Sequence, residues 1–229
     1  MRILLTRPEA DARRSAERLK ALGHEVVIAP LFEIVATSAP VPEGSFERLL
    51  ATSAQAFVDL ADDAGGLKHL PMHVVGERTA SAARNSGFAQ VETVAPDATA
   101  LAIAIARAVP RSQSFLYLAG RERRPELEAA LAALGHRVTP WIVYEARETA
   151  SAASRLRDVW LRERIDAVLH FSPRSAALYV ALAEKAGLRE PAIAPVQVAI
   201  SARVAQSLSG AGDVRVAATP DLAGLIACL

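Results

Sequence analysis

The 229-residue chain carries a formal net charge of +1 at pH 7, and 52% of its residues are hydrophobic while 22% are charged. A chain of this length can bury one large core or two smaller ones. A net charge near zero argues against a protein that coats nucleic acid or anionic membranes. No apolar stretch in the sequence reaches the length of a membrane-spanning helix. We therefore expect a globular α/β protein.

Cysteine and histidine usage argues against disulfides and metal sites. The single cysteine, Cys228, cannot form an internal disulfide or a cysteine-based zinc site, and it suits a reducing compartment. The five histidines are scattered along the sequence, and we expect no metal centre. The first apolar run meets Arg7 and Asp11 too early for a signal peptide. These features predict a cytoplasmic protein.

The predicted elements begin with a strand, a helix and a second strand. Residues 2–6 are typical of a buried strand, residues 9–21 have helical periodicity, and Gly23 ends that helix before the strand EVVIAPL. A strand, a helix and a strand in succession predict a parallel sheet. The same order returns with the strand SFLYLAG, a helix at 125–134, Gly135 and the strand RVTPWIVYEA.

Two further units also occur twice. Residues 46–65 match residues 165–187, and each is a strand that runs into Ser or Thr and then a helix. Residues 73–88 match residues 198–212, and each has a strand, a polar turn, a small-residue helix and a glycine. The tails VAPDATAL and AATPDLAGL are also alike. A repeat of about 110 residues is too long for a solenoid, so it predicts duplicated α/β domains.

The order of the units predicts that one domain is inserted into the other. Residues 39–140 hold the middle two units, the tail and the second opening unit, whereas residues 1–34 plus 148–229 make an equivalent set. We therefore expect a discontinuous domain and an inserted domain. Crossing strands at about 33–38 and 141–147 would join them as a two-stranded β-ladder. The predicted fold class is α/β, with two similar doubly wound parallel-sheet domains.

The turns after the predicted strands form the candidate binding site, because ligands of doubly wound sheets bind at the carboxyl ends of the strands. Hydroxyl caps and backbone N–H groups at helix starts bind anions. An arginine near a helix start also indicates an anionic ligand, since the helix dipole disfavours a cation there. Helix capping and tight turns are the alternative roles. The candidate residues are Thr6, Arg7, Ser53, Gly76, Arg78, Thr79, Gly120, Arg124, Ser172, Ser175, Ser201 and Arg203.

Motifs of several common enzyme classes are missing from the sequence. Neither GxGxxG nor GxxxxGK[ST] follows a strand, which argues against dinucleotide and NTP chemistry. No serine lies in GxSxG, and no pair of carboxylates lies at the turns. The residues alone predict two domains that face a cleft, with many contacts to a polyanion and no obvious catalytic pair.

The chain resembles the uroporphyrinogen-III synthase family over essentially its whole length. The resemblance depends on the order and spacing of ILLTRPE, LGHEVVIAPLFEI, VGERTASAARNSGF, GRERRPELEAALAALGHRV, HFSPRSA and AATPDLAGLI. Family members close hydroxymethylbilane, a linear tetrapyrrole with eight carboxylates, into a macrocycle with inversion of ring D and loss of water. The resemblance implies this activity without a cofactor, in a monomer that receives hydroxymethylbilane from hydroxymethylbilane synthase.

The resemblance also implies roles for particular residues. In the family, a tyrosine on the second linker strand is proposed to assist departure of hydroxide, and Tyr144 in IVYEA matches it. The candidate turn residues become substrate contacts. The chain departs from the family at Ser201, where glycine is usual, and at Phe171, where a hydroxyl residue is usual. Packing of Tyr144 within the linker is the alternative to catalysis. The rival function is a non-catalytic, two-domain binding protein or sensor for a small anion.

Overall fold

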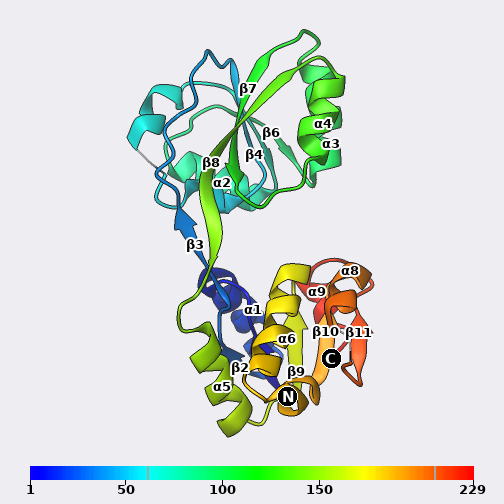
Figure 1. Cartoon of the computed structure of the whole chain (residues 1–229). Coiled ribbons are helices and arrows are strands. Elements are labelled where there is room, and N and C mark those ends of the chain that lie inside the picture. Colours follow the sequence, from blue (N-terminus) through cyan, green and yellow to red (C-terminus); the bar gives the residue numbers. More distant parts are fainter. Residues whose placement is uncertain (61, 209) are drawn as a thin grey trace. The chain divides into compact units, whose positions relative to one another are not determined.

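The chain divides into two units in the computed structural model of the protein. Unit 1 comprises Met1–Glu33 together with Arg147–Leu229, and unit 2 comprises Ile34–Ala146. Each unit is a β-sheet with helices on its faces (Figure 1). The structure describes residues 1–60, 62–208 and 210–229.

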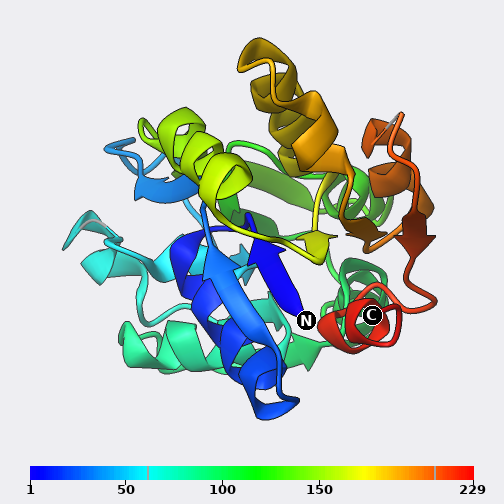
Figure 2. The same ribbon diagram turned by 90° about the horizontal axis from the view of Figure 1, so that it is seen from below.

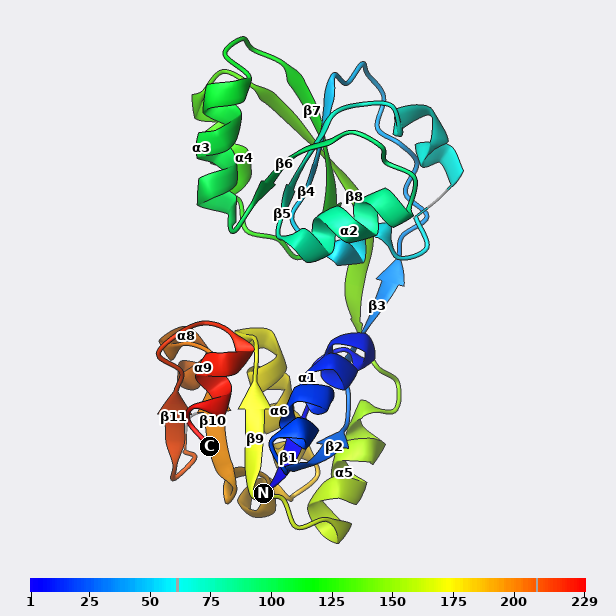
Figure 3. The same cartoon turned by 180° about the vertical axis from the view of Figure 1, so that it is seen from behind.

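Unit 1 contains a five-stranded parallel sheet in the order β11-β10-β9-β1-β2. Helices α1 and α9 pack on one face through Leu19 and Leu225, while α5 and α6 lie on the other face (Figure 1, Figure 3). The strands are β1 (Arg2–Leu5), β2 (Glu25–Ile28), β9 (Ala167–His170), β10 (Val196–Ala199) and β11 (Val214–Val216). The helices are α1 (Glu9–Ala21), α5 (Ala152–Arg162), α6 (Pro173–Lys185), α7 (Arg189–Ile193), α8 (Ala202–Ala205), the 3₁₀ helix η3 (Gln206–Leu208) and α9 (Leu222–Ile226).

Unit 2 contains a sheet in the order β3-β8-β7-β4-β5-β6, in which the strands from β8 to β6 pair in parallel. Helix α2 covers one face, and α3 and α4 cover the other (Figure 3). The strands are β3 (Phe32–Ala36), β4 (Arg48–Ala51), β5 (Met72–Val75), β6 (Val91–Ala95), β7 (Ser114–Gly120) and β8 (Arg137–Glu148). The helices are the 3₁₀ helices η1 (Ala54–Phe57) and η2 (Asp62–Leu67), and α2 (Glu77–Asn85), α3 (Ala98–Ala108) and α4 (Glu126–Ala133).

The two sheets repeat one strand order. The run β8-β7-β4-β5-β6 in unit 2 corresponds strand by strand to β2-β1-β9-β10-β11 in unit 1. The division between the units falls within β3 and β8, which are hydrogen-bonded neighbours. The predicted α/β class with two parallel sheets is therefore confirmed.

The prediction of an α-helix after β4 is wrong. The chain instead forms the two short 3₁₀ helices η1 and η2. Asp59 has a φ of 49°, a left-handed conformation that an α-helix does not tolerate. Gly65 and Gly66 further weaken helix formation in this segment. Unit 2 thus has two short 3₁₀ helices after β4, whereas unit 1 has the α-helix α6 after β9.

Both chain termini belong to unit 1 (Figure 2). The N-terminus leads into β1, which pairs with β2 on one side and β9 on the other. The C-terminus follows α9, and the nearby Cys228 is a free thiol. Across the described part of the chain, no helix has the length and apolar character needed to cross a membrane.

His170 is a fully buried titratable group in unit 1. The Gln197 amide donates to two backbone carbonyls, so its Oε1 accepts a hydrogen bond from Nε2 of His170 at 2.8 Å. Nδ1 of His170 has no hydrogen-bond partner among the described residues. Burial lowers the pKa of His170 from 6.5 to about 4, so the imidazole is neutral near pH 7.

Acid is expected to destabilise the protein through His170. An unfolded histidine binds its proton near pH 6.5, but the folded one does so only near 4, so the free energy of unfolding falls as the pH drops through this window. The expected loss is about 1.4 kcal/mol per pH unit. Urea titrations near pH 6 and pH 5 measure it. The variant His170→Gln keeps a donor toward Gln197 without a titrating group, and should lose less stability over the same interval. Equal losses would contradict the prediction.

Candidate active site

A pocket of about 600 Å³ lies in unit 2 beside the carboxyl ends of β4 and β7. This is the edge at which parallel sheets bind ligands. Hydroxyl groups, two arginines and three carboxylates surround it. The polar lining residues are Thr52, Ser53, Asp97, Thr99, Tyr117, Glu122, Arg123, Arg124, Glu126 and Tyr144.

Tyr144 enters this pocket because the neighbouring strand has no side chain at Gly120. The two residues are opposite each other in the pairing of β7 with β8, next to a register shift after Ala119. A Cβ on Gly120 would lie 2.6 Å from Cζ of Tyr144 and 2.8 Å from its hydroxyl oxygen. Carbon atoms in contact keep about 3.5 Å or more between them. Glycine is therefore required for the observed position of the phenol.

Ser53 and Tyr144 line the same pocket. Ser53 is also the N-cap of η1, and its Oγ accepts a hydrogen bond from the backbone N–H of Gln55 at 3.2 Å. Burial raises the pKa of the Tyr144 phenol and the charge of Glu122 raises it further, although the nearby Ser53 hydroxyl opposes them. Tyr144 therefore keeps its proton at neutral pH and can donate a hydrogen bond.

A second phenol, Tyr117 on β7, lines the same pocket. Its hydroxyl lies 2.6 Å from Oγ1 of Thr52, the residue just before Ser53. Tyr117 is absent from the predicted site residues because it lies within an apolar strand. A signal was nonetheless present, since a buried tyrosine hydroxyl needs a hydrogen-bond partner.

The two arginines of this pocket, Arg123 and Arg124, come shortly after β7 in the sequence. Arg124 is exposed and lines the pocket. Arg123 is also at the pocket, but its Nε donates to Glu128 at 2.7 Å. The structure thus brings together four predicted site residues, which are Ser53, Gly120, Arg124 and Tyr144.

Three other predicted residues lie at the end of β5, outside the lining of this pocket. Gly76 has a φ of 80° and begins α2, so its turn favours glycine. Arg78 in the first turn of α2 is exposed, whereas Thr79 is buried. Only the first two are accessible from solvent at this strand end.

In unit 1, Thr6 and Ser175 pair with each other. Their hydroxyl oxygens are 3.3 Å apart, and both side chains are buried. Ser172 caps α6, because its Oγ accepts from the backbone N–H of Ser175 at 3.1 Å. These predicted contacts therefore link the carboxyl end of β1 to the start of α6.

Two guanidinium groups of unit 1 stack on aromatic rings near these strand ends. Arg7 lies over the ring of Phe171, with its Cζ 4.1 Å from the ring centroid, and its Nη1 donates to Ser15 at 3.1 Å. Arg174 lies over the ring of Phe32 at 4.4 Å. Cation–π contact favours both arrangements. Arg174 was not among the predicted site residues.

Ser201 and Arg203 begin α8 after β10. Ser201 has a φ of −162°, an extended conformation that any residue adopts, so the replacement of the family glycine causes no backbone strain here. Arg203 is exposed in the first turn of this short helix. Both residues stand at the carboxyl edge of the unit 1 sheet.

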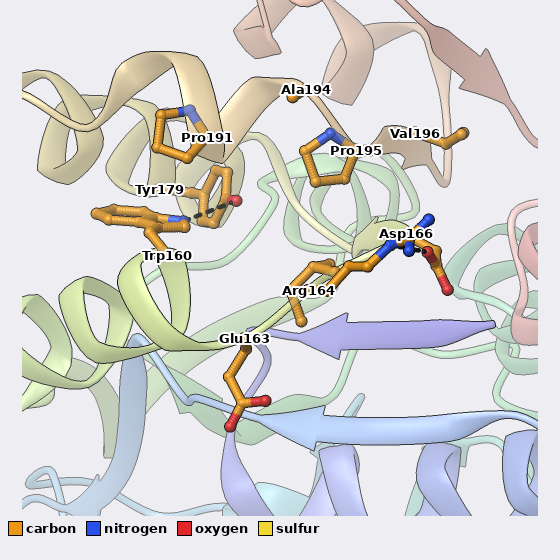
Figure 4. A pocket seen from close by; sticks show the side chains of 10 residues that line it. Trp160, Glu163, Arg164, Asp166, Tyr179, Pro191, Ala194, Pro195 and Val196 are labelled. Atoms are coloured by element: carbon orange, nitrogen blue, oxygen red, sulfur yellow. Dashed lines mark hydrogen bonds and ion pairs between the residues drawn. The ribbon is translucent and has the colours of Figure 1, made fainter.

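Another pocket, of about 390 Å³, lies at the opposite, amino-terminal ends of β9 and β10 (Figure 4). The Trp160 indole N–H donates to the Tyr179 hydroxyl at 3.1 Å, and that hydroxyl donates to the Ala192 carbonyl at 2.8 Å. Glu163 pairs with Arg2, and Asp166 accepts from the Arg2 backbone N–H. These pairings give the indole, the phenol and the two carboxylates of this pocket structural roles.

Within residues 1–60, 62–208 and 210–229, no three His, Cys, Asp or Glu side chains gather as a metal-binding group. Among the polar groups of the unit 2 pocket, the hydroxyls and the two arginines can donate hydrogen bonds to an organic anion. The fold is therefore that of a duplicated parallel α/β protein. Its unit 2 pocket is lined by tyrosine, serine and threonine hydroxyl groups.

The chain belongs to the uroporphyrinogen-III synthase family, since the family model described as uroporphyrinogen-III synthase HemD matches residues 13–227. The resemblance in sequence motifs is thereby confirmed. No match was found among the curated proteins.

Two solved structures of similar fold illustrate the comparison. Uroporphyrinogen-III synthetase from Helicobacter pylori has 18% identity and a TM-score of 0.66, with 99% of this chain and 97% of that chain covered. A mutant uroporphyrinogen III synthase from the extremely thermophilic bacterium Thermus thermophilus has 21% identity and a TM-score of 0.53, with 99% and 96% covered. At these sequence identities, the structural similarity supports the assignment of the fold.

Proposed function

We propose that this protein acts as a uroporphyrinogen-III synthase, which closes hydroxymethylbilane with inversion of ring D and loss of water. The observation that carries this function is the family match over residues 13–227. The rival function, a non-catalytic receptor for a small anion, has no comparable support.

The first chemical step breaks the bond between the hydroxymethyl carbon and its oxygen. The electron pair leaves with oxygen, and the pyrrole stabilises the resulting azafulvene cation. We assign Tyr144 as the donor that assists this oxygen, because its phenol is protonated and lines the pocket. Proton and hydroxide together account for the water released. Ring D then attacks the cation through its substituted carbon, and the spiro intermediate rearranges to the inverted ring. The proton that the substrate loses as its pyrrole rings regain aromaticity replaces the one that Tyr144 donated.

The protein's main contribution is orientation of a flexible, anionic chain. Closure without inversion occurs in solution, so the enzyme must hold ring D in the less accessible geometry. We propose carboxylate contacts through the hydroxyl, backbone N–H and guanidinium groups at the strand ends. Exposure favours Arg78, Arg124 and Arg203 over the buried Thr6, Thr79 and Ser175. The remaining proposed contacts are Arg7, Ser53, Gly76, Gly120, Ser172 and Ser201.

The proposed domains are residues 1–34 with 148–229, and residues 39–140, linked by strands at about 33–38 and 141–147. Pairing of β3 with β8 supports this arrangement. We also propose a cytoplasmic monomer that receives hydroxymethylbilane from hydroxymethylbilane synthase. Light scattering of the purified protein tests the monomer, and a dimer mass would contradict it.

The activity can be tested by coupling the protein to hydroxymethylbilane synthase and porphobilinogen. Oxidation of the product and separation of the uroporphyrin isomers should give mainly isomer III. Isomer I alone, from folded protein, would refute the synthase and favour the binding protein.

Tyr144→Phe is expected to lower kcat about tenfold, less than the roughly hundredfold or more that is typical of general acid catalysis, because orientation is retained. The isomer assay at saturating substrate measures this change. Tyr179→Phe is the matched control, since it removes a buried tyrosine hydroxyl in unit 1 and should leave kcat unchanged. An unchanged rate in Tyr144→Phe would favour the packing role of Tyr144.

A further inference from the structure

Arg123 is not among the proposed substrate contacts, although it lines the same pocket as Tyr144. It lies in the turn between β7 and α4, one residue before Arg124. Its Nε donates to a carboxylate oxygen of Glu128 at 2.7 Å, and the two side chains are only 26% and 24% exposed. The position of Arg123 at the pocket is therefore set by a partly buried ion pair.

Glu128 belongs to a firmly held part of the fold. It lies in the first turn of α4, and the Leu127 and Leu131 side chains of this helix are buried in the unit 2 core. A carboxylate in the first turn of a helix is also stabilised by the helix dipole. Because α4 fixes Glu128, the ion pair restricts the Arg123 side chain, which would otherwise sample many rotamers.

The ion pair uses one side of the Arg123 guanidinium. This planar group carries five N–H donors, so it can face more than one carboxylate. Glu128 accepts from Nε, and the end formed by Nη1 and Nη2 has two parallel donors that match the two oxygens of another carboxylate. Arg123 can therefore bind Glu128 and a ligand carboxylate at the same time.

We propose that Arg123 binds one carboxylate of hydroxymethylbilane through Nη1 and Nη2, and that Glu128 is the positioning residue that holds this end at the pocket. The proposal rests on the proposed synthase activity. Among the groups of a linear tetrapyrrole with eight carboxylates, the carboxylate is the one that accepts two parallel hydrogen bonds. Arg123 contacts a substrate side chain and not the reacting atoms, so it acts on binding.

The test measures KM and kcat of Arg123 variants in the isomer assay. Arg123→Gln removes the charge and should raise KM for hydroxymethylbilane about tenfold with kcat unchanged, as loss of a charged hydrogen bond that contributes only to binding does. Arg123→Lys keeps the charge but loses the two parallel donors, so its KM should rise nearly as much. A wild-type KM in either variant would overturn the proposal.

Arg111→Gln is the matched control for Arg123→Gln. It also removes one cation from unit 2, but Arg111 is exposed and precedes β7, whereas the pocket lies beside the carboxyl end of that strand. Its KM should equal that of the wild type. A KM raised as much as in Arg123→Gln would mean that net charge alone controls binding, and this would contradict a specific contact.

Glu128→Ala distinguishes positioning from the effect of charge. It removes a negative charge beside a polyanionic substrate, so electrostatics alone would lower KM. Positioning predicts the opposite, and KM should rise about threefold because Arg123 must then be ordered when the substrate binds. Glu128→Gln keeps an acceptor oxygen for Nε and should raise KM less. In the Arg123→Gln background, Glu128→Ala should cause no further rise.

A lowered or unchanged KM in Glu128→Ala would overturn the positioning role, and an unchanged KM with a lower free energy of unfolding would show that the ion pair only fastens the turn to α4. Should Arg123→Gln fail to fold, Arg123→Lys and Glu128→Ala supply the comparison. Wild-type protein that makes isomer III, together with Arg123 variants of wild-type KM, overturns the proposal and leaves the function intact. Absence of isomer III from folded wild-type protein refutes the synthase, and the role of Arg123 falls with it.

Discussion

Gly120→Ala is expected to slow turnover about a hundredfold. The added Cβ would lie 2.6 Å from Cζ of Tyr144, so the ring must move by about 1 Å to regain normal contact. Such a displacement of a positioned group can cost about a hundredfold in rate. The loss should exceed that of Tyr144→Phe, because the displaced ring also enters the space of the pocket. Measuring kcat at saturating hydroxymethylbilane checks this expectation.

Gly66→Ala is the matched control for Gly120→Ala. It makes the same change in unit 2, at a position where a Cβ would meet nothing within 4 Å. Its kcat should equal that of the wild type. A Gly120→Ala enzyme with the wild-type rate would mean that the Tyr144 ring can move without consequence, and this would contradict the proposed site.

Gly224→Ala is expected to lower the free energy of unfolding by about 3 kcal/mol, as overpacking of a tight contact does. The Cβ would lie 2.2 Å from the backbone carbonyl oxygen of Thr219, which cannot rotate away as a side chain can. The change also disturbs the cap of α9, where the Gly224 N–H donates to Asp221 at 2.7 Å. Urea unfolding monitored by circular dichroism measures the loss.

Gly212→Ala supplies the comparison in unit 1, because a Cβ there meets nothing within 4 Å. Its unfolding midpoint should remain close to that of the wild type. If both variants unfold at the same urea concentration, the contact between Gly224 and Thr219 does not constrain α9.

The duplicated fold could be predicted because its signals are local and occur twice. The apolar run at β7 is buried at every residue, and the glycines Gly23 and Gly135 follow helices in equivalent places. The segment after β4 could not be predicted in the same way. Its match to residues 165–187 indicated a helix, but Asp59 and the glycines that follow produce 3₁₀ turns instead. Similar positions in a repeat do not require similar helices.

The candidate site was only partly predictable, because spacing does not fix which side chains meet. The rule that ligands bind at strand ends was enough to select Ser53, Gly120 and Arg124. The same rule selected Thr6 and Ser175, whose hydroxyls pair although they are 169 residues apart in the sequence. Tyr117 was missed because the apolar pattern of β7 does not show that the hydroxyl group of this tyrosine reaches the pocket.

The division of unit 1 between the two ends of the chain has a consequence for protein synthesis. Unit 2 is one continuous segment, so all of its strands have been made by the time Ala146 emerges from the ribosome. In unit 1, by contrast, the Arg2 backbone N–H at the start of β1 bonds to Asp166, a residue 164 positions later. The apolar β1 must therefore wait, unpaired on its β9 side, while unit 2 is completed. The sheet of unit 2 can therefore be completed during synthesis while the sheet of unit 1 still lacks β9, β10 and β11.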